Sequence, residues 1–228
     1  DPYQELKVVV RQNNRPDREI VGLMPKFVRG TALVYDFEEE TVFPGGSEFR
    51  YFGMQSLRYK SKEVKEIIFA DPYYHIDLEP DHPRPNKPYS YHKDLNGNYY
   101  IDIQESERDA LQADYVFVHF KLKRDYPIPG YQIYVAGRHN GWQFGKDNLM
   151  AYNPISKSYE AMLMLKQGYY NYTYVARRKG TPELDGALLE GSHYQTENDY
   201  LIYVYHRSLA ARYDRLIGFH KLNTVKRM

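Results

Sequence analysis

The residues best suited to bind a ligand lie in one short stretch, Arg138-His139-Asn140-Gly141-Trp142. Trp142 is the only tryptophan, and an exposed indole on a turn can stack on a sugar ring or on a partner's aromatic side chain. Arg138, His139 and Asn140 would then supply hydrogen bonds beside it. The alternative is that the indole plugs the end of a β-sandwich. From the sequence, both interpretations stay open.

The sequence offers no spacing typical of a catalytic or metal site. Its eight histidines form no H-x-H or H-E-x-x-H pattern. Cysteine is absent, which excludes thiol catalysis, disulfides and cysteine-ligated metals. Carboxylates are plentiful, but no spacing selects a pair for glycosidic chemistry. We therefore expect a protein that is not an enzyme, with no catalytic residues, no metal site and no cofactor.

The elements around the candidate stretch are predicted to be strands. Tyr131, Ile133 and Val135 would face one side of a strand, which runs into a turn at Gly137, Asn140 and Gly141. Runs that alternate or are rich in β-branched and aromatic residues predict further strands. These cover 6–10, 19–23, 32–37, 64–69, 74–78, 99–103, 114–122, 159–165, 169–175 and 200–205, the last of them buried. Asn96-Gly97 is a type I′ signal and predicts a hairpin that returns along 99–103.

The fold class that follows is all-β, with two β-sandwich domains. The polar run over 105–112 indicates a boundary, so we expect a β-sandwich over 1–111 and an immunoglobulin-like sandwich over 112–222. Residues 223–228 would form a polar tail. Within the first domain, Glu48 and Arg50 would share a strand face, either as a surface ion pair or as a charged recognition ridge.

The charge balance bears on the partners. With 31 basic and 30 acidic residues the net charge is +1, which indicates neither nucleic acid nor an anionic membrane. No apolar run reaches the roughly 18 residues of a membrane-spanning helix. The 25 tyrosines suit either a tyrosine-rich sandwich surface or a surface for recognising a partner.

Several phrases, taken in order, resemble the signature of a known family. They are 45–52 (GGSEFRYF) with 56–59 (SLRY), 114–120 (DYVFVHF), 197–200 (ENDY) with 203–207 (YVYHR), and 212–218 (RYDRLIG). This pattern is similar to that of the plug protein family of the Bacteroidetes type IX secretion system, formerly a domain of unknown function. The resemblance implies a periplasmic, outer-membrane-associated protein that docks on an outer-membrane translocon protein and closes its pore from inside. It also implies that the chain is the later part of a longer protein whose N-terminal portion is missing.

A second resemblance concerns the second expected domain alone. Val135-Ala136-Gly137 and Asn140-Gly141-Trp142 are similar to the early-set sandwich of glycogen-binding modules. Those modules bind glycans with exposed tryptophans, so this likeness implies a carbohydrate-binding protein with Trp142 as its platform. Partner binding and glycan binding are thus the two functions carried forward.

Overall fold

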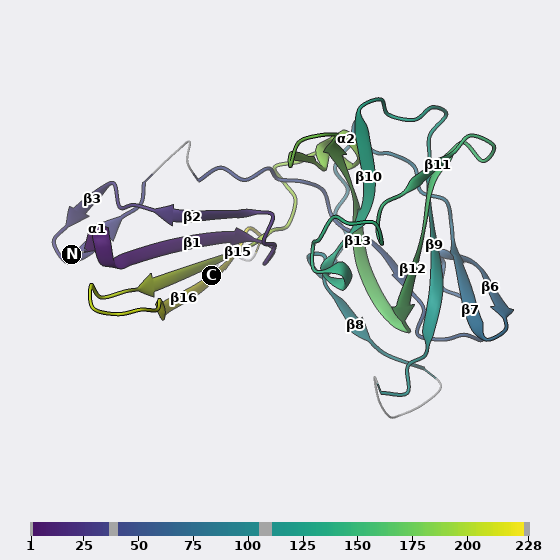
Figure 1. Ribbon diagram of the computed structural model, residues 1–228, viewed down its shortest axis with the longest axis horizontal. Helices are drawn as coiled ribbons and strands as arrows, with labels where there is room; N and C mark the ends of the chain where they lie inside the picture. The colour runs from purple at the N-terminus through teal and green to yellow at the C-terminus, as the bar shows by residue number, and fades with distance from the viewer. Residues whose placement is uncertain (1, 37–40, 105–110, 226–228) are drawn as a thin grey trace. The chain divides into compact units, whose positions relative to one another are not determined.

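The computed structural model describes residues 2–36, 41–104 and 111–225 (Figure 1). Its regular structure is almost entirely β, which confirms the predicted all-β class. The chain divides into two compact units. Unit 1 comprises Asp1–Gly45 and Gln195–Met228, and unit 2 comprises Gly46–Tyr194. Purple and yellow strands in Figure 1 belong to unit 1, and blue to green strands belong to unit 2.

Unit 1 is built from the two ends of the described chain. Its four-stranded antiparallel sheet has the order β16-β15-β1-β2. The strands are β1 (Leu6–Gln12), β2 (Glu19–Leu23), β15 (Asp199–His206) and β16 (Arg215–Asn223). A short helix, α1 (Pro2–Glu5), precedes β1, and β3 (Phe27–Arg29) and β4 (Ala32–Val34) form a separate two-stranded ribbon.

The two faces of the unit 1 sheet differ in exposure. One face carries the buried side chains of Val8, Gln12 and Leu23. The strand register places Leu201 and the buried Val9 on the opposite face. Five further apolar and aromatic residues of that face make up what we name the open face of unit 1: Val21, Tyr203, Tyr205, Leu216 and Phe219. Val21, Leu216 and Phe219 are at least half exposed. β15, expected to be buried, is instead half-buried along its whole length.

Unit 2 is a sandwich of two five-stranded sheets. The first sheet has the order β11-β12-β9-β7-β6, with β11 (Ala151–Asn153), β12 (Ser158–Lys166), β9 (Tyr115–Lys123), β7 (Tyr73–Leu78) and β6 (Val64–Ala70). In the second, β13 (Gly168–Arg178) pairs with β10 (Tyr131–Ala136), β14 (Leu184–Asp185), β5 (Arg50–Gly53) and β8 (Tyr99–Ile101). Two short helices, η1 (Arg138–Asn140) and α2 (Ala187–Glu190), complete the unit.

Side chains from both sheets fill the core of unit 2. Phe52 and Tyr172 of the second sheet lie against Phe120 of the first, with ring centroids 5.1 to 5.7 Å apart. All three side chains are buried. A core shared between two sheets confirms the sandwich architecture for this unit.

The structure corrects the expected domains, 1–111 and 112–222. β7 pairs in parallel with β9, and β5 and β8 both pair with β13, so strands from either side of residue 111 share the same sheets. β1 and β15 likewise join the ends of the chain in unit 1. Most of the polar run that suggested a boundary, 105–110, lies outside the described residues, as do 226–228 of the expected tail. Pairing between strands that are distant in sequence therefore sets the boundaries of the two units. The local change in composition near residue 111 does not mark those boundaries.

The Asn96-Gly97 signal is correct as a turn and wrong as a hairpin. Asn96 and Gly97 have φ of 52° and 79°, as a type I′ turn requires. However, no strand precedes the turn in residues 90–95. The return strand β8 pairs instead with Gly168–Tyr170 of β13.

Candidate functional site

The predicted site at Arg138–Trp142 is a tight turn held by one amide. The Asn140 side chain accepts hydrogen bonds from the backbone N–H groups of Gly137 and Trp142, both at 3.2 Å. Its amide nitrogen donates to the carbonyls of Val135 and Gln143, again at 3.2 Å. Asn140 therefore shapes the turn and has no remaining capacity as a ligand-binding amide.

Trp142 is not a stacking platform. Its side chain is only 4% exposed and packs edge-on against Phe49, with ring centroids 5.8 Å apart. Ala136 and Val175 complete this small core, and Gly97 lies so close that a Cβ there would meet the indole at 2.6 Å. The burial expected of a structural indole is confirmed, although the ring lies in a small cluster separate from the main core of the sandwich. The exposed glycan platform is wrong, because packing covers the ring that a sugar would need.

Arg138 and His139 do not form a polar patch beside the indole. Arg138 is exposed, whereas both imidazole nitrogens of His139 are buried and have no hydrogen-bond partner among the described residues. Burial lowers the pKa of His139 to about 4, so the ring is neutral at physiological pH. Of the four predicted binding residues, Arg138 alone is freely presented to solvent.

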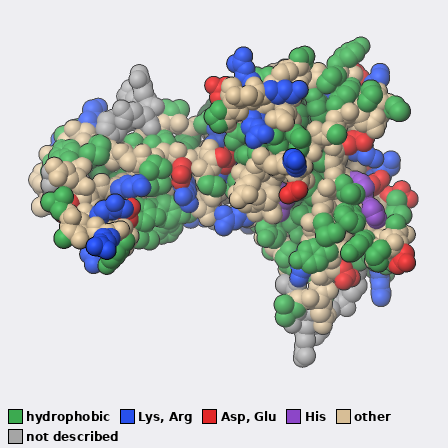
Figure 2. All heavy atoms as spheres, in the orientation of Figure 1, with side chains coloured by type: hydrophobic (Ala, Val, Ile, Leu, Met, Phe, Trp, Pro, Cys, Tyr) green, Lys and Arg blue, Asp and Glu red, His purple; other side chains and the backbone are tan. Residues whose placement is uncertain are grey.

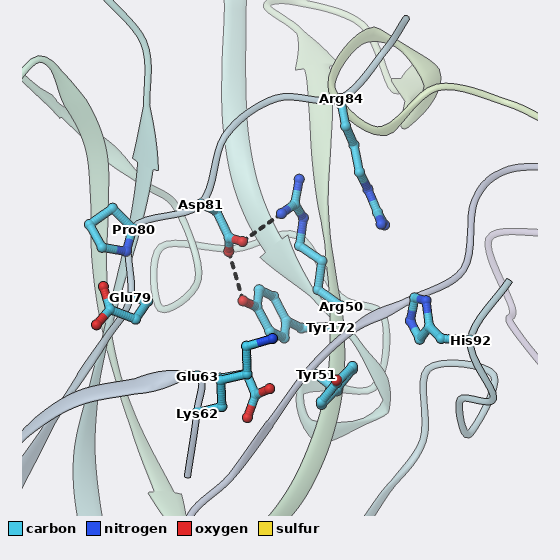
Figure 3. Close-up of a pocket in the computed structure, with 10 residues that line it drawn as sticks. All are labelled: Arg50, Tyr51, Lys62, Glu63, Glu79, Pro80, Asp81, Arg84, His92 and Tyr172. Carbon is cyan, nitrogen blue, oxygen red and sulfur yellow. Dashed lines mark hydrogen bonds and ion pairs between the residues drawn. The ribbon is translucent and has the colours of Figure 1, made fainter. Parts of the chain in front are cut away.

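A charged pocket of about 360 Å³ lies elsewhere in unit 2 (Figure 3). Its walls come from β5, the residues just before β6, the segment after β7, and β13. The lining residues are Arg50, Tyr51, Lys62, Glu63, Glu79, Pro80, Asp81, Arg84, His92 and Tyr172. Sequence reasoning had singled out only Arg50 among them, and with the wrong partner.

Arg50 is the centre of this pocket. Its Nη1 donates to Asp81 Oδ1 at 2.5 Å, its Nε to Glu190 Oε1 at 2.9 Å, and its Nη2 to the carbonyl of His82 at 2.7 Å. The guanidinium also lies over the ring of Tyr174, 5.3 Å from its centroid. The expected Glu48–Arg50 surface pair is therefore wrong: the Arg50 guanidinium forms charge-assisted hydrogen bonds with Asp81 and Glu190.

Glu48 is also buried, at 3% exposure, and does not lie on a solvated ridge. Its carboxylate accepts a hydrogen bond from the hydroxyl of Tyr89 at 2.5 Å, and its backbone carbonyl accepts one from Arg84. Both interpretations of Glu48 required an exposed strand face, which the structure does not provide.

Glu190 closes the network at the edge of β13. Its carboxylate accepts hydrogen bonds from Arg50, from Arg84 Nε at 2.6 Å and from the backbone N–H of Tyr174 at 3.0 Å. Burial alone would raise the pKa of Glu190, but the two guanidinium groups hold it below its usual range. The Glu190 side chain thus supplies a fixed negative charge. It also accepts the hydrogen bond of the Tyr174 N–H, at the point of β13 that lies between the residues paired with β5 and those paired with β14.

Asp81 fixes the opposite side of the pocket floor. It accepts hydrogen bonds from the hydroxyls of Tyr172 at 2.7 Å and Tyr174 at 2.8 Å, besides Arg50. Burial, followed by the Asp81 charge, raises the pKa of both phenols well above 10, so they stay protonated donors. The floor is a saturated network of ions and hydrogen bonds that links β5, β13, α2 and the segment after β7.

Two further properties constrain what this arrangement can do. Within the described ranges, no three His, Asp or Glu side chains are grouped so that they could hold a metal ion. None of the helices in those ranges has the length and apolarity to cross a membrane. Lys62, Glu63, Glu79 and His92 also line the pocket, so charged and polar side chains are available there to contact a ligand.

Comparison with known proteins finds a solved structure that is similar to the chain. No family model matches the chain, and no curated protein matches it. The crystal structure at 2.30 Å of a hypothetical protein from Parabacteroides merdae ATCC 43184 is similar to it, with a TM-score of 0.91 and 35% sequence identity. The match covers 98% of this chain and 56% of that chain, so this chain spans little more than half the length of its relative. The two proteins therefore share both units of the fold.

Proposed function

We propose that the chain is a non-enzymatic binding protein of the periplasm that docks on an outer-membrane translocon protein and closes its pore, as a type IX secretion plug does. The resemblance of residues 45–59, 114–120 and 197–218 to that family supports the proposal. The glycan alternative is dropped, because it required an exposed Trp142.

The observation that carries partner binding is the open face of unit 1. Val21, Leu216 and Phe219 are 50%, 50% and 56% exposed, and Tyr203 lies between Tyr205 and Phe219 at ring distances of 6.4 and 5.3 Å. Figure 2 shows hydrophobic side chains in green reaching the surface of this unit. A contiguous exposed apolar and aromatic surface is typical of a protein interface.

Two ion pairs lie on this face, which also carries the exposed Lys7. Arg11 contacts Glu19 at 2.6 Å and lies 5.8 Å from the ring centroid of Tyr203, and Lys221 contacts Asp199 at 2.8 Å. An interface here would bury rings and aliphatic chains at its centre and keep these ion pairs at its rim. That arrangement suits a folded protein partner better than an anionic polymer.

Recovery from a bacterial envelope tests this proposal. Immobilised wild-type protein is incubated with detergent-solubilised envelope of a type IX-secreting bacterium, and the retained proteins are identified by mass spectrometry. We expect a large outer-membrane translocon protein to be retained. Leu216→Asp and Phe219→Asp should abolish its recovery, because each places a charge in the open face.

Leu209→Asp is the matched control, since Leu209 is an 86% exposed leucine of the same unit outside the sheet. It should recover as much translocon protein as the wild type. Absence of any outer-membrane protein from the wild-type sample would overturn the proposed function.

A further inference from the structure

One strand of unit 2 has a backbone edge that is only partly covered. β12 pairs with β9 along its whole length, from Ser158 to Lys166. On its other side it pairs with β11 over Ser158–Glu160 alone. Beyond that point, the edge of β12 at 162–165 has no strand beside it among the residues that the structure describes.

The hydrogen-bond pattern shows which groups point out of this edge. On β9, the carbonyl of Lys121 and the N–H of Lys123 bond to Asp81, on the side away from β12. In an antiparallel ladder, the alternate residues of β9 therefore bond to β12. Their partners are Tyr159, Ala161, Leu163 and Leu165. The N–H and C=O groups of Met162 and Met164 consequently point away from β9, and the described residues give them no partner.

This edge lacks the usual protection against strand addition. Proteins commonly guard an edge strand with charged residues or proline. β6, at the far edge of the same sheet, carries Lys65 and Glu66, and β16 of unit 1 carries Arg215 and Lys221. The run Met162-Leu163-Met164-Leu165 contains neither, and both methionines are about half exposed.

A hollow of about 640 Å³ lies beside the same four residues. Its remaining lining comes from β9, η1 and the loop after η1: Phe117, His139, Asn140, Gln143, Gly145, Lys146, Asp147 and Asn148. The volume is enough for side chains of an incoming segment. The lining is apolar along β12 and polar along the loop.

His139 lines this hollow and has unused hydrogen-bonding capacity. The amides of Asn140 and Asn148 are committed to backbone groups of Val135 and Gln143. By contrast, both nitrogens of His139 are buried and unpartnered within the described chain. A buried polar group without a hydrogen bond destabilises the protein, because nothing compensates the loss of its contacts with water. A ligand group that hydrogen-bonds the imidazole would remove that destabilisation.

From these observations we propose that the free edge of β12 binds an extended segment of a partner polypeptide as an added strand. The two pairs of backbone groups on Met162 and Met164 match a strand, whose own groups repeat every second residue. No small ligand needs that spacing. This second site lies in unit 2, uses no residue of the open face of unit 1, and holds whether or not the partner is a secretion translocon.

The edge also defines the side chains of the segment. Those on the outer side of the sheet would contact Met162 and Met164 and should be apolar. Those on the inner side would follow Leu163 and Leu165 into the hollow, and one should carry a hydroxyl or amide that can both donate to and accept from neutral His139. A short uncharged segment of alternating apolar and Ser, Thr or Asn residues fits both sides.

Peptide selection tests the proposal directly. A phage-displayed library of unconstrained dodecapeptides is selected on the full chain, and the selected peptides are measured by fluorescence anisotropy. Met164→Pro removes the outward N–H without removing a bond to β9, because that N–H does not face β9. We expect it to weaken binding at least tenfold. Met164→Ala keeps the N–H and should stay within about threefold of wild type.

Amide exchange gives a readout that does not depend on the proline variant folding. In the free protein, the amides of Met162 and Met164 should exchange faster than those of Leu163 and Leu165. The bound peptide should slow exchange at Met162 and Met164 selectively. Such an alternating pattern is not produced by general stabilisation of unit 2.

Four outcomes would overturn the inference, three of them from the peptide experiments. Those three are a library that yields no binder, peptides that bind a folded Met164→Pro variant as tightly as wild type, and a bound state without added protection at Met162 and Met164. Dimerisation of the chain through this edge would also contradict it, because the occupant would be a second copy. If the envelope protein is still recovered in any of these cases, the proposed function stands and only the β12 site fails.

Discussion

Glu190 lies within 2.9 Å of Arg50 although 140 residues separate them in the chain. No sequence pattern around either residue identifies the other as its partner. Their contact, with those of Arg84 and Asp81, ties α2 to β5 and to the segment after β7. The charged pocket is thus as much a structural junction as a surface for recognition.

Removing the Glu190 charge should destabilise unit 2 strongly. Glu190→Gln leaves the guanidinium groups of Arg50 and Arg84 short of a buried countercharge, and breaking a buried pair costs about 3–5 kcal/mol. Urea unfolding should show that loss in the free energy of unfolding. The surface substitution Glu19→Gln, which removes the half-exposed partner of Arg11, should cost less than about 1 kcal/mol. Equal effects of the two substitutions would mean that the Glu190 network contributes little.

Gly97 should tolerate no side chain, for two separable reasons. Its φ is 79°, and a Cβ would meet the Trp142 indole at 2.6 Å and Phe49 at 2.9 Å. Gly97→Ala should therefore combine backbone strain with overpacking and cost roughly 2–4 kcal/mol in thermal or urea unfolding.

Gly130→Ala is the matched control for Gly97→Ala. Gly130 has φ of 76° but nothing within 4 Å of its Cβ position, so only strain of about 1 kcal/mol remains. If both variants lose the same free energy of unfolding, the close packing of Gly97 against Trp142 does not contribute to stability.

Trp142 provides a spectroscopic test of the small core around it. Because its side chain is 4% exposed, the single tryptophan should emit at short wavelength and resist quenching by acrylamide. Phe49→Ala removes the ring that packs edge-on against the indole and should shift the emission to longer wavelength. Tyr59→Ala, at a 78% exposed position, should leave the spectrum unchanged. A red-shifted, easily quenched wild type would contradict the buried position.

The sequence predicts the local elements far better than the assembly. Strands at 6–10, 19–23, 64–69 and 169–175 are found, because alternation and β-branched residues determine extended backbone locally. The positive φ of Asn96 and Gly97 is also local and was predictable. The choice of strand partners depends on which residues, distant in sequence, are buried together. For that reason neither the division of the chain into units nor the partner of β8 could be predicted from the sequence.

The candidate site shows the same limit. The predicted binding residues are neighbours in sequence but differ in burial: Arg138, His139, Asn140 and Trp142. Residue type alone therefore predicted a binding site that the structure does not contain. Asp81, Tyr172 and Glu190 carry no motif, and only the packing of β13 against the segment after β7 brings them together. A hydrogen-bond network between residues so distant in the chain has no recognisable sequence pattern.

The pH dependence of stability should be dominated by two buried groups of opposite sign. His139 has a folded-state pKa of about 4, below the usual 6.5, because burial disfavours the charged ring. The unfolded chain therefore binds the proton more tightly, and stability falls as pH drops from 6.5 towards 4. The full difference is on the order of 3 kcal/mol. His139→Phe should flatten the curve of unfolding free energy over this window.

Asp94 acts in the opposite direction. Burial raises its pKa to about 6 from 3.8, despite hydrogen bonds from the backbone N–H groups of Phe49 and Asn96. Its contribution is fully present below pH 3.8 and is lost as pH rises through 6, so it offsets part of the His139 effect. Asp94→Asn should steepen the acid-side loss of stability, whereas His139→Phe flattens it. Urea unfolding at intervals between pH 4 and 7 separates the two, and parallel curves for both variants would contradict the assignment.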